Sequence, residues 1–228
     1  MDFGGCPLIS HVVSAASAAD GIRGSVVVTS DHPSDNELVE WCHSHGVQVW
    51  RGDLNDVADR LLGAAAYYGT SSFVRVSGDS PMLDPQIISF AVRRFGMSSP
   101  DLVTNVRPRT FPPGQSVEVI RTRTLERLLA SADSHPGDQE HVTPILYRHE
   151  SEIEVDRFAP SDMQSGTSTL NGPYKSMAVD TPEDAECFRR VIRDAGSTQV
   201  WMRGWEQCEA MMRDAHQRLH GGPGAWHA

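Results

Sequence analysis

Two aspartates stand where a predicted strand gives way to a helix, and they are the side chains best placed to do chemistry. Asp79 follows an apolar strand at 72–76, and Asp180 follows a short apolar strand at 177–179. Ligands of open α/β sheets bind beyond the carboxyl ends of the strands. Although they are far apart in the sequence, we therefore expect the two carboxylates to share one site, where they would hold Mg²⁺ against a phosphate.

The residues that follow each aspartate predict how the two carboxylates are held. Asp84 and Pro85 are typical of the cap and the first position of a helix. Thr181 and Pro182 are typical of another helix start. Because Thr181 can cap that helix without help, the carboxylate of Asp180 is expected to remain available for a ligand.

Hydrophobic patterning predicts the elements that carry these residues. Helix and strand signals alternate up to residue 104 with short connections, and a loop rich in Pro, Arg and Gly follows at 107–115. We expect an α/β fold with a mainly parallel sheet that is covered by helices on both faces. The expected strands are 25–29, 47–50, 72–76, 102–104, 116–121, 151–157 and 177–179. The expected helices are 6–19, 34–44, one capped by Asp53, one from Pro85, 122–131, a short one to His149, 182–195 and 198–219. Mobile segments are expected at 160–173 and 221–228.

Composition excludes several classes of partner. The chain of 228 residues carries 20 Lys and Arg against 30 Asp and Glu, a net charge of −10, which argues against binding of nucleic acid through phosphate neutralisation. No apolar run is long enough to span a membrane and no signal peptide is recognisable, so we expect a cytoplasmic protein. The four cysteines are widely spaced, and we expect free thiols.

Several segments occur in an order that resembles one known family. This ordered set resembles the cytidylyltransferases of the spore coat polysaccharide type, whose wider relatives make CMP-3-deoxy-manno-octulosonate and CMP-sialic acid. The segments are Arg51-Gly52 followed by Asp59-Arg60, then 77–85, 105–114, 117–119, 140–144 and 179–184.

The resemblance implies a fold, a reaction and an organisation of the chain. The fold would be a Rossmann-like sheet of the nucleotide-diphospho-sugar transferase type. The reaction would transfer CMP from CTP to a sugar or sugar-acid acceptor and release pyrophosphate. Residues 1–195 would form the cytidylyltransferase-like α/β domain, with 105–175 as the portion for the acceptor and for homodimer formation. Residues 196–228 would form a C-terminal helix and tail.

The resemblance also assigns roles to individual residues. Asp79 and Asp180 would be the catalytic pair that holds Mg²⁺. The nucleotide would contact Ser30, Asp31, Arg51, Asp59, Arg60, Ser77 and Gly78. The acceptor would contact Asn105, Arg107, Arg109, Gly114, Glu118, Glu140 and His141, of which the last two are expected to begin a helix.

One part of the family pattern is not found in this sequence. The family begins with a strand and a glycine-rich phosphate loop, whereas the segment 1–8 resembles the stretch that follows this loop. We therefore expect that the first, central strand of the sheet is missing and that residues 1–228 alone are impaired in catalysis, because the loop would normally hold the triphosphate.

Two other functions stay open at this point. The chain could be a non-catalytic dimer partner or a nucleotide-sensing pseudoenzyme. A weaker alternative is a glycosyltransferase of the GT-A type, but these enzymes usually hold their metal with an Asp-x-Asp pair, and the segment 31–35 does not provide one. Individual residues also have structural readings, such as a solvent-facing helix position for Arg60.

Overall fold

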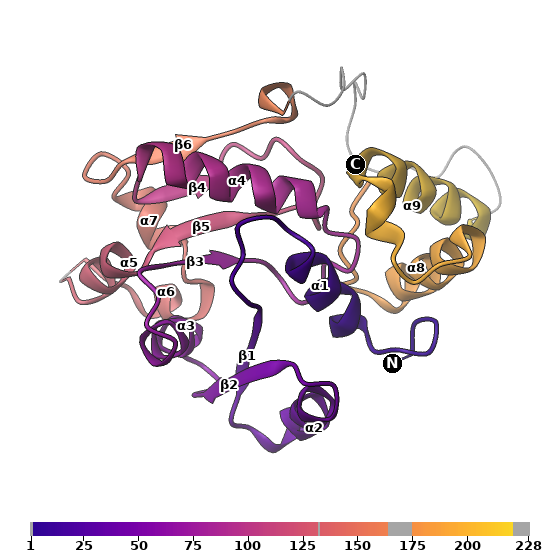
Figure 1. Ribbon diagram of the computed structural model, residues 1–228, viewed down its shortest axis with the longest axis horizontal. Coiled ribbons are helices and arrows are strands. Elements are labelled where there is room, and N and C mark those ends of the chain that lie inside the picture. The colour runs from indigo at the N-terminus through magenta and orange to yellow at the C-terminus, as the bar shows by residue number, and fades with distance from the viewer. Residues whose placement is uncertain (1, 132, 164–174, 221–228) are drawn as a thin grey trace.

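The computed structural model describes residues 2–131, 133–163 and 175–220 (Figure 1). The predicted tail 221–228 and most of the predicted loop 160–173 lie outside the described residues. The helices are α1 (Leu8–Ser17), α2 (Asn36–Ser44), α3 (Val57–Tyr67), α4 (Pro85–Ser98), α5 (Thr122–Leu129), α6 (Pro136–His141), α7 (Pro144–Arg148), α8 (Pro182–Ala195) and α9 (Trp205–Leu219). The strands are β1 (Val26–Ser30), β2 (Gln48–Gly52), β3 (Ser72–Arg75), β4 (Leu102–Thr104), β5 (Glu118–Arg121) and β6 (Val155–Arg157).

The strands form two sheets, and the α/β class expected from the sequence is confirmed. β1 and β2 form a parallel two-stranded sheet. The other sheet has four strands in the order β3-β5-β4-β6. β5 runs antiparallel to both β3 and β4, whereas β6 runs parallel to β4. The sheet is therefore mixed and not mainly parallel, because a loop without a crossover helix returns the chain from β4 to β5.

The two sheets are not joined by a strand ladder among the described residues. Within the described parts of the chain, β1 pairs only with β2, and β3 pairs only with β5. Each of these strands therefore has one edge whose backbone groups take part in no ladder. A missing central strand would leave a break of this kind, and that expectation stays a prediction.

The starts of the two helices near the aspartates follow the predicted capping. The Asp84 side chain accepts a hydrogen bond from the backbone N–H of Gln86 at 2.8 Å. At the start of α8, Thr181 and Asp184 cap each other reciprocally. Asp180 is thus not needed as a cap, as the sequence predicted.

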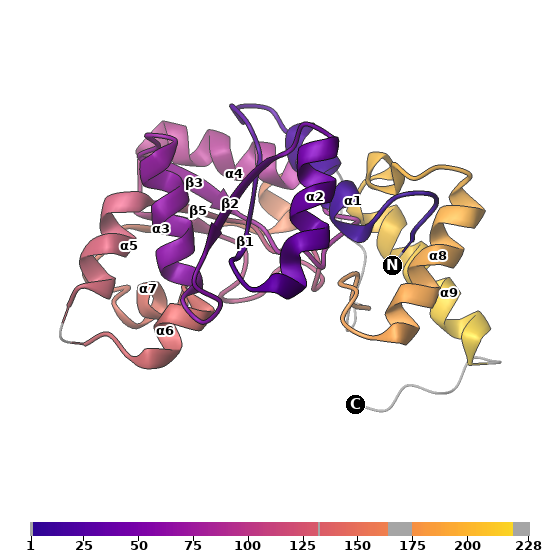
Figure 2. The same cartoon turned by 90° about the horizontal axis from the view of Figure 1, so that it is seen from below.

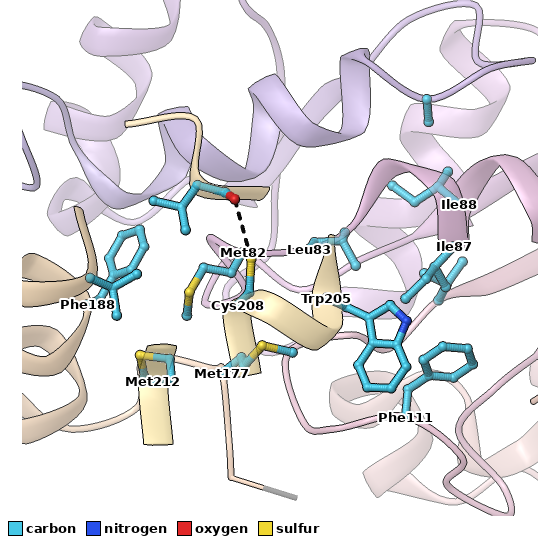
Figure 3. Close-up of a cluster of buried hydrophobic side chains, with 14 of the residues drawn as sticks. Met82, Leu83, Ile87, Ile88, Phe111, Met177, Phe188, Trp205, Cys208 and Met212 are labelled. Atoms are coloured by element: carbon cyan, nitrogen blue, oxygen red, sulfur yellow. Dashed lines mark hydrogen bonds between the residues drawn. The ribbon is translucent and has the colours of Figure 1, made fainter. Parts of the chain in front are cut away.

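The described residues form two hydrophobic clusters, and one of them fixes α8 and α9 against α4 and the sheet (Figure 3). Met82, Phe188, Trp205 and Met212 all belong to it. Burying a side chain of this size stabilises the fold by roughly 1.5–3 kcal/mol. A hydrogen bond also connects α9 to the start of α4, because the Asp84 side chain accepts from the backbone N–H of Trp205 at 3.0 Å. The C-terminal helices are therefore held firmly beside the start of α4.

Four local predictions are wrong. Residues 177–179 form no strand, because the N–H groups of Met177 and Val179 bond to two separate loops and that of Ala178 bonds to the Ser176 hydroxyl. The predicted helix 198–219 is interrupted at Gly204, where φ is +81°. Glu140 and His141 lie at the end of α6, a helix that the sequence did not predict. Asp56, and not Asp53, caps α3.

No helix among the described residues has both the length and the apolar character needed to cross a lipid bilayer.

Candidate active site

Three backbone segments meet at that end of the four-stranded sheet where β3 ends. They are the turn 77–80 after β3, the loop 112–115 before β5, and the segment 176–181 before α8. The backbone N–H of Val179 donates to the carbonyl of Asp79 at 2.8 Å, and that of Met177 donates to the carbonyl of Pro113 at 2.9 Å. The direct bond between residues 79 and 179 brings Asp79 and Asp180 close together, and their shared role in a ligand site stays a prediction.

Gly114 allows this convergence. Its φ is +91°, and a Cβ atom at this position would lie 2.6 Å from the carbonyl carbon of Met177 and 2.7 Å from the nitrogen of Ala178. No side chain fits in that space, and backbone at positive φ favours glycine. Gly114 therefore sets the path of the segment that carries Asp180. Its expected contact with the acceptor stays a prediction.

The two carboxylates repel each other. Partial desolvation raises the pKa of Asp180 above its ordinary value although its side chain is exposed, and the charges of Asp79 and Asp184 raise it further. Among the described residues neither Asp79 nor Asp180 has a cationic ion-pair partner; the hydroxyl of Ser80 donates to Asp79 Oδ1 at 2.9 Å. Two uncompensated carboxylates at one point offer the oxygen ligands that Mg²⁺ prefers.

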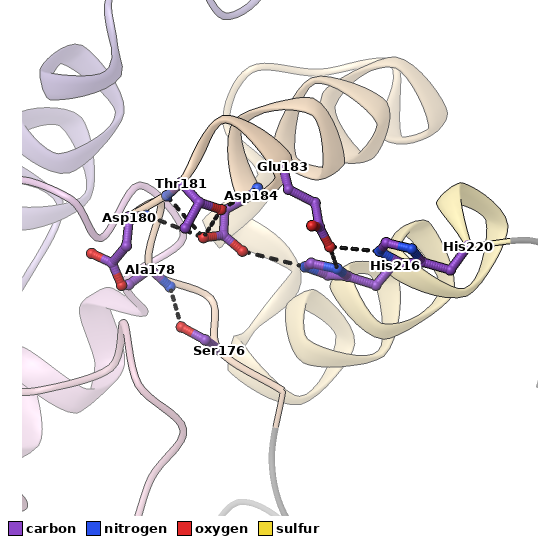
Figure 4. Close-up of polar contacts among 8 residues, drawn as sticks. All are labelled: Ser176, Ala178, Asp180, Thr181, Glu183, Asp184, His216 and His220. Carbon is purple, nitrogen blue, oxygen red and sulfur yellow. Dashed lines mark hydrogen bonds and ion pairs between the residues drawn. The ribbon is translucent and has the colours of Figure 1, made fainter. Parts of the chain in front are cut away.

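Asp184 lies between Asp180 and His216 (Figure 4). Its Oδ2 accepts from the backbone N–H of Thr181 at 3.0 Å and from that of Asp180 at 3.3 Å. These bonds hold the backbone of Asp180 in place and leave its side chain on the open side, where it is exposed. Ser77 and Gly78 are exposed in the turn before Asp79, so the site is open to a ligand.

A buried polar network lies at the same end of the four-stranded sheet. Glu118 at the start of β5 is 2% exposed and pairs with Arg75 at the end of β3, with 3.1 Å between Arg75 Nη1 and Glu118 Oε2. Tyr147 donates to Glu118 Oε1 at 2.6 Å and lies 2.7 Å from the hydroxyl of Thr104. Burial and the Glu118 charge raise the pKa of Tyr147, so its hydroxyl stays protonated. Arg107 lies over the Tyr147 ring, 5.1 Å from its centroid.

Sequence reasoning singled out Glu118 and Arg107 but missed the other members of this network. Arg75 had a signal, since it is the one charged residue in an apolar strand. Thr104 and Tyr147 had none, because only the folded chain brings α7 beside β4 and β5.

The loop 107–115 is ordered by the residues expected to bind the acceptor. The Asn105 amide is buried, donates to the carbonyl of Gln115 at 2.8 Å and accepts from the N–H of Val117 at 2.9 Å. Arg109 is exposed and donates to the Ser116 hydroxyl at 2.9 Å. Asn105 thus shapes the loop, while the exposed arginines remain accessible.

The residues expected near the cytosine lie at the ends of β1 and β2. Arg51 donates to the carbonyls of Ser30 and His32 at 2.9 and 3.1 Å. The Ser30 hydroxyl donates to Asp35 at 2.6 Å, and hydrogen bonds from Ser30 and Thr29 hold the pKa of Asp35 well below its ordinary value. The Asp35 carboxylate therefore binds the end of β1 through Thr29 and Ser30. Asp31 follows with an exposed side chain.

Arg60 is not a solvent-facing helix residue. It is 9% exposed, packs against Gly52, and donates to the carbonyls of Asp53 and Leu54 at 2.6 and 2.9 Å. Asp59 beside it is exposed on the first turn of α3. Arg60 thus holds the loop between β2 and α3 in place, and Asp59 stays accessible at its edge.

Glu140 and His141 do not join the aspartate pair. They are exposed at the end of α6. Both ribbon views place α6 at one end of the molecule and α8 at the other (Figure 2). Within one copy of the chain, these two residues therefore lie away from Asp180.

Comparison with known proteins decides the family. The profile of a family described as cytidylyltransferase matches residues 1–208. This chain belongs to the cytidylyltransferase family. The expected resemblance is thereby confirmed, and membership supports nucleotidyl transfer as the class of reaction.

Named relatives agree with this membership. The chain is 28% identical over 224 residues to 3-deoxy-manno-octulosonate cytidylyltransferase of Mesorhizobium japonicum, covering 84% of this chain and 90% of that one. It is 27% identical over 171 residues to the spore coat polysaccharide biosynthesis protein SpsF of Bacillus subtilis, covering 75% and 68%. An uncharacterized protein of Methanocaldococcus jannaschii is 31% identical over 137 residues, and the chain spans 55% of its length.

Solved structures confirm the fold. A cytidylyltransferase from Leptospira borgpetersenii superposes with a TM-score of 0.80 at 21% identity, covering 100% of this chain and 91% of that one. A CMP:2-keto-3-deoxy-manno-octonic acid synthetase solved with CTP superposes with a TM-score of 0.62 at 16% identity, covering 86% and 91%. At these identities the similarity concerns the fold alone.

Proposed function

We propose that this cytidylyltransferase transfers CMP from CTP to a sugar-acid acceptor, with Asp79 and Asp180 as ligands of Mg²⁺. The observation that carries the proposal is the meeting of the two carboxylates through the backbone bond from residue 179 to residue 79. The raised pKa of Asp180 agrees with a pair of charges that lacks a counter-ion. Oxygen-only donors, one half-buried and one exposed, fit a hard divalent cation.

The chemistry needs no covalent intermediate on the protein. An acceptor oxygen attacks the α-phosphorus of CTP in line, the bond from the α-phosphorus to the bridging oxygen breaks, pyrophosphate leaves, and the hydroxyl proton passes to solvent. When bound, Mg²⁺ would stabilise the charge on the α-phosphate and lower the pKa of the acceptor hydroxyl. The role of the chain is to position the reactants: Asp79 from the turn after β3, and Asp180 from the segment that Gly114 and Asp184 hold.

An acidic acceptor suits the residues beside the pair. Arg107 and Arg109 are exposed on the loop that precedes β5, and a planar guanidinium binds a carboxylate with two parallel hydrogen bonds. A relative is named for 3-deoxy-manno-octulosonate, a sugar acid. The proposal also includes a cytoplasmic homodimer whose subunits contact each other through the portion 105–175. The family resemblance alone supports this part.

We also propose that residues 1–228 alone are impaired. Support comes from the strands β1 and β3, each of which has one edge outside any ladder of the described residues, and from the lack of a strand–glycine loop–helix phosphate motif in the sequence. An N-terminal extension that supplies such a strand and loop is expected to restore turnover.

The test measures pyrophosphate release from CTP, with UTP as the matched control, for residues 1–228 and for an N-terminally extended version. Sugar acids such as 3-deoxy-manno-octulosonate serve as acceptors. Release that needs CTP, a divalent cation and the sugar acid supports the proposal. If the extended version binds CTP but releases no pyrophosphate with any sugar acid, the chain is a nucleotide-sensing or partner protein, and the proposal fails.

A further inference from the structure

A second set of metal-ligating side chains lies on the other side of the start of α8. Glu183 is in the first turn of α8, and His216 and His220 are one turn apart on α9. One ligand atom from each residue lies within 4.8 Å of the other two. Figure 4 shows the three side chains converging between the two helices, beyond Asp184 and away from Asp180.

The distances suit a small divalent ion after a slight adjustment. Glu183 Oε1 lies 3.3 Å from His216 Nδ1 and 2.6 Å from His220 Nε2. Four ligands at 2.0–2.1 Å in a tetrahedron are about 3.3–3.4 Å from one another. The His216 contact already has this spacing. The His220 contact must open by less than about 1 Å, and both Glu183 and His220 are exposed side chains that can move.

His216 is held ready for this role. It is 3% exposed, and its Nε2 makes no hydrogen bond within the described residues, although Asp184 Oδ1 lies 3.4 Å away. Metal-bound histidines usually donate their second ring N–H to a carboxylate, which fixes the tautomer and the ring. With Nε2–H directed at Asp184, the lone pair of Nδ1 points toward Glu183. Burial and the nearby Lys175 charge lower the pKa of His216, although Asp184 and Glu183 oppose this.

We propose that Glu183, His216 and His220 form a site for Zn²⁺ or a similar transition-metal ion, with a fourth position open to solvent. Two imidazole nitrogens and one carboxylate favour such ions over Mg²⁺. The site ties the start of α8 to the end of α9. Because Asp184 contacts both His216 and the backbone of Asp180, an ion bound here also steadies the segment that carries Asp180.

The test is calorimetric titration of the tag-free protein with ZnCl₂ in the presence of excess Mg²⁺, which occupies oxygen-only sites. We expect one Zn²⁺ per chain. His220→Gln and Glu183→Gln should each weaken this binding at least tenfold, and Asp184→Asn should weaken it about 10–100-fold. The matched control is His43→Gln, an exposed histidine on α2, which should bind like the parent.

A second measurement keeps the result independent of folding. Metal-free His220→Gln should melt at the parent's temperature, but Zn²⁺ should raise the melting temperature of the parent and of His43→Gln only. The proposal is overturned if Zn²⁺ binds the His220→Gln and Glu183→Gln variants as it binds the parent, if Asp180→Asn abolishes the binding instead, or if the parent binds no Zn²⁺.

Discussion

The aspartate pair beyond β3 and two arginines, Arg51 at the end of β2 and Arg60 on α3, were all expected to serve the nucleotide, yet the two groups differ in the partners of their charges. Asp79 and Asp180 lie together without a cationic partner in the described part of the chain. Arg51 and Arg60 instead donate to backbone carbonyls. The aspartate pair thus remains available for a ligand, whereas the two arginines hold loops of the backbone in place.

The difference implies that the two regions fail in different ways. Removing a carboxylate from the pair relieves repulsion and therefore affects the ligand more than the fold. Removing Arg60 leaves two carbonyls without their donors and opens a space beside Gly52, which affects the fold first. The predictions below test this separation, from the largest expected effect to the smallest.

Gly114→Ala is expected to have the largest effect on stability. The new Cβ would lie within 2.7 Å of the backbone at Met177 and Ala178, at a φ that disfavours alanine. We expect a loss of about 3 kcal/mol, or roughly 10 °C in melting temperature, together with loss of metal binding, because the Asp180 segment must move. Calorimetric melting measures this loss. Gly96→Ala, in open space on α4, is the control and should be neutral or slightly stabilising; equal melting of both variants would contradict this role for Gly114.

Arg60→Ala should destabilise the fold by about 2 kcal/mol, because a buried side chain and two hydrogen bonds are lost. Denaturant unfolding measures the change. Arg127→Ala, an exposed arginine on α5, is the control and should stay within about 0.5 kcal/mol of the parent. If Arg60→Ala left the stability unchanged but abolished CTP binding, Arg60 would be a ligand contact. The claimed difference between the arginines and the aspartate pair would then be wrong.

Asp180→Asn should have a small effect of the opposite sign. The pKa of Asp180 is raised in the folded state, so the ionised carboxylate disfavours folding once the pH rises past its ordinary value of 3.8. Without metal at pH 7, the variant should melt at most about 2 °C above the parent. This difference should vanish as the pH falls below the ordinary value, and Mg²⁺ should stabilise the parent but not the variant. A lower melting temperature at pH 7 would show that the carboxylate is not repelled.

Local signals predicted much of the fold. The caps at Asp84 and Thr181 depend on residues next to each other, and both were correct. The direction of β5 was not predictable, because pairing between distant strands decides it. The short helix α6 was missed because Pro136-Gly137 is typical of a loop. Residues 177–179 have the composition of a strand, but their hydrogen bonds go to separate loops.

The candidate site was predictable to a similar extent. That Asp79 and Asp180 lie close together was predicted from two strand ends at one edge of a sheet. The proximity is correct but the reason holds for Asp79 only, because 177–179 is no strand and a backbone bond from Val179 to Asp79 brings Asp180 there instead. Burial could not be predicted in the same way. Arg60 resembles an exposed helix residue in sequence, and only the packing of Gly52 against it shows that it is buried. Tyr147 reaches Glu118 only because α7 folds back over the sheet.

The central claim is that Asp79 and Asp180 together hold a divalent cation at the nucleotide. Electron paramagnetic resonance with Mn²⁺ in place of Mg²⁺, in the presence of CTP, measures this directly. With the site at Glu183, His216 and His220 filled by Zn²⁺, we predict that the parent and Asp20→Asn, an exposed control, bind one Mn²⁺ equally well. Asp79→Asn and Asp180→Asn should each bind at least tenfold more weakly, about 1.4 kcal/mol, with unchanged circular dichroism. A parent that binds no Mn²⁺, or aspartate variants that bind it as tightly as the parent, would contradict the account.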